Sequence, residues 1–182
     1  MERKYCNHIQ PLNNRGFTLI ELIITIAVLS FGVIGVYSAF SPVVALSYTI
    51  SSRTTAAYLG QEGFEIVRNI RDNNFIKKAA NPSIPWYRGL ADCALGCQAD
   101  YKTGTAAQTP QNYLKPYDQG IFLKLNQEGF YAYDSGTDTP FTRKIIITWE
   151  GSDILKVHVL VLWNYNGQGY NFETYGYLYN WN

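Results

Sequence analysis

The chain contains one long stretch without a charged side chain, and this stretch limits the possible folds more than any other feature. After Glu21 the next charged residue is Arg53, so 31 consecutive residues carry no formal charge. Within it, residues 22–40 (LIITIAVLSFGVIGVYSAF) are almost wholly apolar. At about 1.5 Å per residue, a helix over residues 17–40 is roughly 36 Å long, enough to cross a hydrocarbon core of about 30 Å. The sequence therefore predicts one membrane-spanning helix, over residues 17–41.

Basic residues precede this helix and set its predicted orientation. Residues 1–16 carry a net charge of +2, whereas the rest of the chain carries −1. By the positive-inside rule, residues 1–16 are expected to be cytoplasmic and everything after the helix to lie outside. The apolar run is longer than the core of a conventional secretory signal, and no Ala-x-Ala site follows it closely. On hydropathy alone, an uncleaved signal anchor stays an alternative.

The junction between the basic segment and the apolar run carries more information than hydropathy. Gly16 stands directly before Phe17, and an unbranched residue there suits a protease that cuts from the cytoplasmic side. Glu21 follows four residues later, inside the apolar segment. A charge well inside a bilayer costs about 2.5–3.5 kcal/mol on insertion scales, with relief near a helix end. An intramembrane carboxylate is therefore a hypothesis of function, with a partner to be named.

This segment, RGFTLIELIITIAVL, resembles the signal of type IV prepilins and of type II secretion pseudopilins. The resemblance implies that residues 1–16 are a leader, that prepilin peptidase cuts between Gly16 and Phe17, and that the new amine of Phe17 is methylated. It also implies that Glu21 pairs with the N-terminal amine of a neighbouring subunit in a filament. The implied partners are other pilin subunits, prepilin peptidase and an inner-membrane assembly platform. In one departure, the proline that many pilins carry within the apolar run comes slightly later here, at Pro42, where we expect a kink.

Beyond the membrane segment, residues 42–75 are expected to form an amphipathic helix with an apolar face at three-to-four-residue spacing. Residues 76–120 are rich in Pro, Gly, Ala and Asn and predict a long irregular connection. It contains Cys93 and Cys97, which remain once Cys6 leaves with the leader. Outside the membrane a disulfide can form and persist, so a small bridged loop is expected, with free thiols as the alternative. One cysteine pair without a nearby histidine does not fill a zinc shell.

Residues 121–182 predict antiparallel strands. Residues 121–125 and 129–133 flank a turn, as do residues 144–149 and 157–163, and a further turn leads into the last strand. Alternation places the apolar residues of the second pair on one face, which the amphipathic helix is expected to cover. The predicted fold class is α+β: a long N-terminal helix packed on a C-terminal antiparallel sheet, as in the pilins that the chain resembles. The aromatic residues near the C-terminus fill this sheet or form a contact surface for subunits, a sugar or another surface ligand.

The sequence contains no recognisable catalytic constellation. His158 lies in a predicted strand without an acid–base partner identifiable from spacing, and no phosphate-binding loop or metal-spaced histidine pair occurs. The loop from Asp134 to Asp138 suits a turn, with a calcium site as the alternative. The net charge of +1 does not indicate a nucleic-acid partner. We therefore expect no cofactor, no metal and no enzymatic activity.

Two classes of function remain. The first is a structural filament subunit, and loose similarities in the strands and the closing Tyr-Asn-Trp favour a minor pilin over a secretion pseudopilin. Such a subunit is a single-pass membrane protein before assembly and part of an extracellular or periplasmic filament afterwards. The second class is a signal-anchored extracytoplasmic enzyme or receptor. In that class the Gly16–Phe17 junction and Glu21 have no role.

Overall fold

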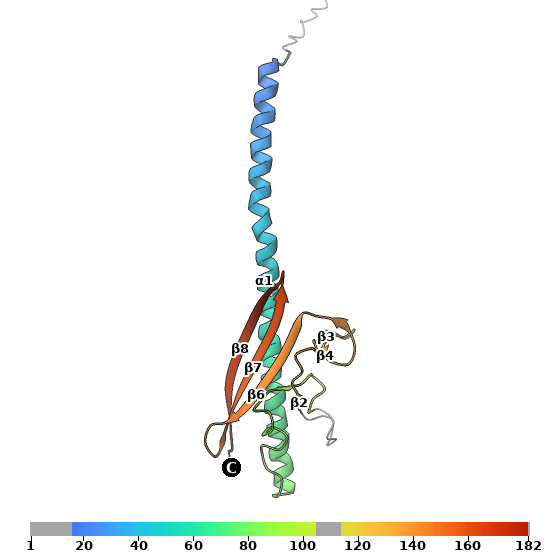
Figure 1. Cartoon of the computed structure of the whole chain (residues 1–182), viewed down its shortest axis with the longest axis vertical. Helices are drawn as coiled ribbons and strands as arrows, with labels where there is room; N and C mark the ends of the chain where they lie inside the picture. The colour runs from blue at the N-terminus through green and yellow to red at the C-terminus, as the bar shows by residue number, and fades with distance from the viewer. Residues whose placement is uncertain (1–15, 105–113, 182) are drawn as a thin grey trace, which may run out of the picture. The chain divides into compact units, whose positions relative to one another are not determined.

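The chain divides into two compact units that share one helix. The computed structural model describes residues 16–104 and 114–181. The two units are Met1–Tyr48 and Thr49–Asn182, and helix α1 (Leu19–Ala80) contributes residues to both (Figure 1). The expected α+β class is confirmed, since this long helix precedes antiparallel sheets.

Part of the predicted organisation lies outside the described residues. This applies to the leader apart from Gly16, to Cys6, and to residues 105–113 of the predicted connection. The division into a membrane segment over 17–41 and an amphipathic segment over 42–75 stays a prediction. Helix α1 passes through this boundary without a break, although Pro42 lies inside it.

The C-terminal end of α1 differs from the sequence-based expectation. The polar run after residue 71 was expected to end the helix by residue 75, but α1 continues to Ala80. The reason is the role of Asn74, which is buried and whose side-chain amide donates to the carbonyls of Trp86 and Arg88, 3.1 and 2.8 Å away. An asparagine whose side chain is occupied by a distant loop does not compete for its own backbone, so it no longer breaks the helix.

The main sheet is antiparallel and lies entirely within the second unit. The two hairpins expected from the sequence are present: Glu150 to Asp153 connects the first pair of long strands, and Asn166-Gly167 connects the second. Asn166 and Gly167 have φ values of 50° and 77°, as the two central residues of a type I′ turn require. The strand order is β2-β1-β6-β7-β8, with bounds β1 (Cys97–Gln98), β2 (Lys115–Pro116), β6 (Phe141–Trp149), β7 (Ile154–Tyr165) and β8 (Gln168–Tyr179) (Figure 1).

The hairpin predicted over residues 121–133 is present but shorter than expected. Its strands pair over two residues each. The first begins only at Lys124, since the backbone amide and carbonyl of Leu123 bond to Phe141 and Thr139 instead. The turn extends to Phe130, whose amide donates to the Asn126 side chain, so the second strand begins at Tyr131. A third short strand completes this small sheet in the order β4-β3-β5, with bounds β3 (Lys124–Leu125), β4 (Tyr131–Ala132) and β5 (Thr137–Asp138).

The core of the second unit lies between α1 and one face of the main sheet. The predicted apolar face of the helix supplies Leu59, Ile66, Val67 and Ile70, all buried. Glycines bring the two layers close: a Cβ at Gly63 would lie 2.9 Å from Val159, one at Gly60 would lie 2.9 Å from Phe172, and one at Gly176 would overlap the ring of Phe64. The buried sheet residues on this face are Phe141, Arg143, Ile145, Ile147, Leu155, Val157, Val159, Val161, Trp163 and Leu178.

Two residues on this face depart from the predicted pattern. Trp149 lies on the same face as Ile145 and Ile147, as expected, but it is 42% exposed and packs edge-on against Trp86 and Tyr87, at ring distances of 5.9 and 5.0 Å. Arg143, which the sequence did not single out, is fully buried there instead.

Arg143, on the sheet, is held by groups from two other parts of the second unit. Its guanidinium donates to the Leu59 carbonyl at 2.9 Å, to the Ala99 carbonyl at 2.5 Å and to the Glu62 carboxylate at 2.6 Å. These contacts join the helix, the connection and the sheet at one point. A buried charge is tolerated only when it is paired and hydrogen-bonded in this way.

Candidate processing and assembly segment

The predicted cleavage junction is accessible in the structure. Gly16, Phe17 and Thr18 precede helix α1 and have no regular secondary structure. Phe17 is 79% exposed, and no atom lies within 4 Å of a Cβ built on Gly16. Protease sites concentrate in exposed, non-helical segments because the peptide bond there can extend into an active site. The geometry is therefore compatible with a cut between Gly16 and Phe17.

Helix α1 begins with a side-chain cap that the sequence analysis missed. The amide of Glu21 donates to the hydroxyl of Thr18 at 3.3 Å, and the amide of Leu22 donates to the Thr18 carbonyl at 3.2 Å. Threonine is a preferred N-cap, and Thr-x-x-Glu is the capping-box pattern. That signal was available in the sequence. The cap fixes Glu21 in the first turn, where a negative charge is also favoured by the helix dipole.

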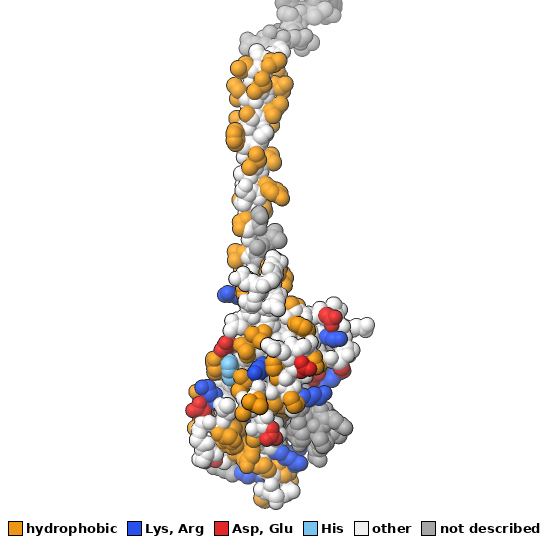
Figure 2. Space-filling view, viewed as in Figure 1, with side chains coloured by type: hydrophobic (Ala, Val, Ile, Leu, Met, Phe, Trp, Pro, Cys, Tyr) orange, Lys and Arg blue, Asp and Glu red, His pale blue; other side chains and the backbone are white. Residues whose placement is uncertain are grey.

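Glu21 is the one charged residue of a helix surface that is otherwise apolar. Residues Leu19–Phe40 form a stretch long and apolar enough to span a membrane, and its large hydrophobic side chains are exposed. Hydrophobic side chains cover the visible face of this helical stretch, whereas charged side chains gather over the second unit (Figure 2). Among the residues that the structure describes, no cation pairs with Glu21. A helix that is apolar all round is stable only when membrane or other protein surrounds it.

The aliphatic hydroxyls of Thr25, Ser30 and Ser38 are satisfied within the helix. Thr25 donates to the carbonyl of Leu22 at 2.9 Å, and Ser30 donates to the carbonyl of Ile26 at 2.7 Å. Ser38 makes the same kind of bond one turn back, at 2.9 Å. Because these polar groups need no partner outside the helix, they do not oppose burial in lipid or among other helices. Glu21 is the one charged side chain of Leu19–Phe40 and requires an external partner.

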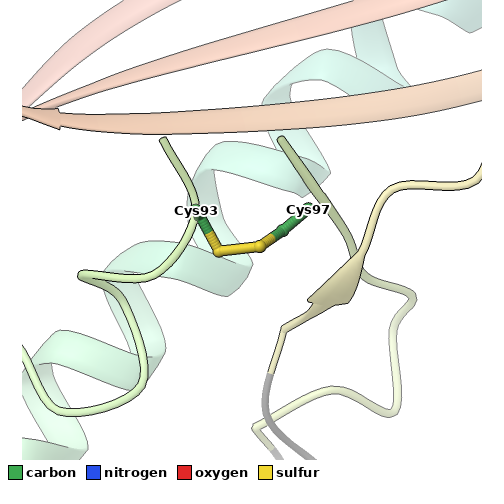
Figure 3. Close-up of a disulfide and its surroundings, with 2 residues drawn as sticks. All are labelled: Cys93 and Cys97. Atoms are coloured by element: carbon green, nitrogen blue, oxygen red, sulfur yellow. A yellow bond between two sulfur atoms is a disulfide. The ribbon is translucent and has the colours of Figure 1, made fainter. Parts of the chain in front are cut away.

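The two cysteines singled out from the sequence form a disulfide in the second unit (Figure 3). Both are buried, and the loop between them turns at Gly96, which has a φ of 111°. The Cys93 carbonyl accepts from the amides of Gly96 and Ile147, both at 3.1 Å, and Cys97 pairs with Ile145 of β6. The bridged loop thus carries strand β1 along the edge of β6.

The loop considered for calcium is held by lysines. Asp134 pairs with Lys102 at 2.5 Å, and Asp138 lies 3.5 Å from Lys124. The hydrogen bond from Lys102 holds the pKa of the Asp134 carboxyl below its usual range. Within residues 16–104 and 114–181, no group of three or more His, Cys, Asp or Glu side chains is placed to hold a metal ion.

His158 has neighbours that spacing did not predict, because they come from the adjacent strand. Its ring stacks on Tyr175 at 4.2 Å, and its Nε2 lies 3.2 Å from the Glu173 carboxylate. The Tyr175 hydroxyl also donates to Glu173 at 2.6 Å, which lowers the pKa of Glu173 and raises that of Tyr175. These side chains lie on the face of the sheet away from α1, far along the chain from the junction at Gly16.

Comparison with known proteins gives one match. The family model described as the prokaryotic N-terminal methylation motif matches residues 11–37. No curated protein and no solved structure matches the chain. The matched residues include the exposed junction, the capped first turn and Glu21. The chain therefore carries the N-terminal methylation motif, the signature of type IV prepilin-like proteins.

Proposed function

We propose that the chain is a structural subunit, and specifically a minor pilin, of a type IV pilus-type filament. The observation that carries this proposal is the position of Glu21, one capped turn after an accessible junction and alone on an apolar helix surface. The methylation motif supports a pilin- or pseudopilin-like protein. A membrane-anchored precursor that later joins a surface filament fits both features.

In this proposal, prepilin peptidase cuts between Gly16 and Phe17 and leaves a new amine on Phe17, which is then methylated. The leader keeps the precursor in the membrane until the cut is made. The assembly platform then moves the apolar helix from lipid to a bundle of other subunits' helices. Its surface suits both environments, because neither offers water to unsatisfied polar groups.

Glu21 acts as the register device of this assembly. Paired with the Phe17 amine of a neighbouring subunit, it is neutralised among packed helices. A subunit displaced along the bundle leaves both charges unpaired, and breaking a buried pair costs about 3–5 kcal/mol. That penalty is large enough to select one register over its neighbours.

The second unit is the part that a filament of this kind displays. It has its own core, a disulfide and a buried ion pair, all outside the apolar segment. A secretion pseudopilin is the alternative within the same class, since the motif is common to both kinds of subunit. A signal-anchored enzyme or receptor is the alternative from another class.

Mass spectrometry of the N-terminus tests the proposal. We expect the mature protein to begin with an N-methylated Phe17, and Gly16→Val to stay at full length because a β-branched side chain blocks the cut. Gly32→Val, deeper in the helix and also without atoms within 4 Å of its built Cβ, is the matched control and should be processed normally. An intact N-terminal leader on the wild-type protein in its native host would support the signal-anchored class instead.

A further inference from the structure

A groove crosses the face of the main sheet that points away from α1. Its volume is about 440 Å³, within the range of roughly 300–1,000 Å³ that small-molecule sites occupy. The floor comes from outward-facing residues of β6, β7 and β8, among them Leu160 and Leu162. One wall is the connection that carries Gln119 and Phe122. Packing in the core does not account for Leu160 and Leu162, because the core lies on the opposite face of the sheet.

The polar side chains of the groove are mainly neutral amides. Gln119, Asn164 and Asn171 all line it. In the described part of the chain, the side chains of Gln119 and Asn164 have no hydrogen-bond partner. Each amide offers donors and an acceptor together, which matches a hydroxyl group that also donates and accepts.

The lining of the groove disfavours ionic ligands. No lysine or arginine lines it, so a phosphate or carboxylate ligand finds no counter-charge. Its one carboxylate, Glu173, already accepts hydrogen bonds from Asn171 at 2.9 Å and Tyr175 at 2.6 Å and lies 3.2 Å from His158. A carboxylate with these partners has little capacity left for a cationic ligand.

The apolar part of the groove supplies a flat surface beside the amides. Phe122 is 42% exposed and, like Gln119, lines the groove from the connection. A ligand that satisfies both kinds of surface has a C–H face for the ring and hydroxyls for the amides. We propose that this groove binds a neutral saccharide.

Saturation-transfer-difference NMR on the full chain in dodecylphosphocholine micelles tests the proposal. Because this assay needs no filament, failure of saccharide binding can be distinguished from failure of the proposed role as a filament subunit. The probes are maltose, lactose and N,N′-diacetylchitobiose, with glucose 6-phosphate and N-acetylneuraminic acid as charged comparisons. We expect transfer to at least one neutral disaccharide and a weaker signal for both charged sugars. No transfer to any neutral disaccharide, or stronger transfer to the charged sugars, would overturn the proposal.

Variants of groove residues test whether the saccharide binds in the groove. Gln119→Ala and Phe122→Ala should each weaken the affinity by about two- to tenfold, the effect of losing one hydrogen bond or one ring contact. Matched controls are Gln127→Ala, an exposed amide in a turn, and Tyr177→Ala, an exposed ring on the same sheet face outside the groove. Circular dichroism checks that all four variants fold. Equal affinity in the groove variants and the controls would place the sugar elsewhere and refute the assignment.

Discussion

The ion pair between Arg143 and Glu62 gives the sharpest stability prediction. Arg143 is fully buried, whereas the Glu62 side chain is 30% exposed. Glu62→Ala leaves the guanidinium with only the carbonyls of Leu59 and Ala99, and its Nε has no hydrogen-bond partner among the described residues even in the wild type. A hydrogen bond to a charged group contributes about 1.5–3 kcal/mol. Because water reaches the glutamate side of the pair, we expect a loss of unfolding free energy within that range.

A matched variant on the same helix separates this effect from general loss of helix charge. Glu65 pairs with Arg68 at the same distance, 2.6 Å, but both side chains are about half exposed. Exposed pairs contribute about 0–1 kcal/mol, so Glu65→Ala should change stability little. The assay is urea unfolding of the full chain in micelles, followed by tryptophan fluorescence, since all four tryptophans lie in the second unit. Equal losses in Glu62→Ala and Glu65→Ala would refute the role assigned to the buried guanidinium.

Two further predictions concern the second unit. Non-reducing mass analysis should show Cys93 and Cys97 two hydrogens lighter than free thiols, and ready alkylation without reductant would contradict this. Reduction should raise amide exchange in the connection over residues 76–104 and 114–120 without unfolding β6 and β7. Burial raises the pKa of Tyr133 to about 12. The folded pKa lies above the unfolded value of about 10, so folding favours the neutral phenol. The contribution of Tyr133 to the unfolding free energy is therefore fully present below pH 10 and is lost as pH rises towards 12. Between pH 10 and pH 12, the unfolding free energy of Tyr133→Phe should therefore fall by about 2–3 kcal/mol less than that of the wild type. Parallel curves of unfolding free energy against pH would contradict this.

The sequence predicted the elements with strong local patterns. The uncharged run, the period of the amphipathic helix and the alternation in β7 each follow from neighbouring residues, and all three appear in the structure. The hairpin turns were equally readable, since Asn166-Gly167 is a strong local signal for a tight turn.

The features that sequence reasoning missed depend on distant partners. Helix α1 continues beyond residue 75 because Asn74 binds a loop more than ten residues away. Arg143 alternates with Ile145 but was not singled out from the sequence, because its burial depends on the Glu62 carboxylate and two distant carbonyls. Strands of two residues, such as β1, carry no periodicity and are held by pairing with β6.

The candidate sites also differ in how far the sequence alone could predict them. The roles proposed for Gly16, Phe17 and Glu21 rest on a contiguous, linear signal, which the sequence alone displays. The Thr18 cap was equally visible as Thr-x-x-Glu but was overlooked beside the charge of Glu21. The saccharide groove was not predictable in detail, because Gln119, Phe122 and three strands meet only in the folded chain.

The register role of Glu21 is tested most directly by the fraction of each variant recovered in sheared filaments relative to membranes, with leader cleavage scored in parallel. Glu21→Leu should insert and be cleaved normally, because the Gly16–Phe17 junction is untouched, yet it should enter filaments poorly since the neighbour's amine is left unpaired. Glu21→Asp keeps the charge but shortens its reach by one methylene, so we expect intermediate incorporation. Incorporation of Glu21→Leu at the wild-type level would contradict the account.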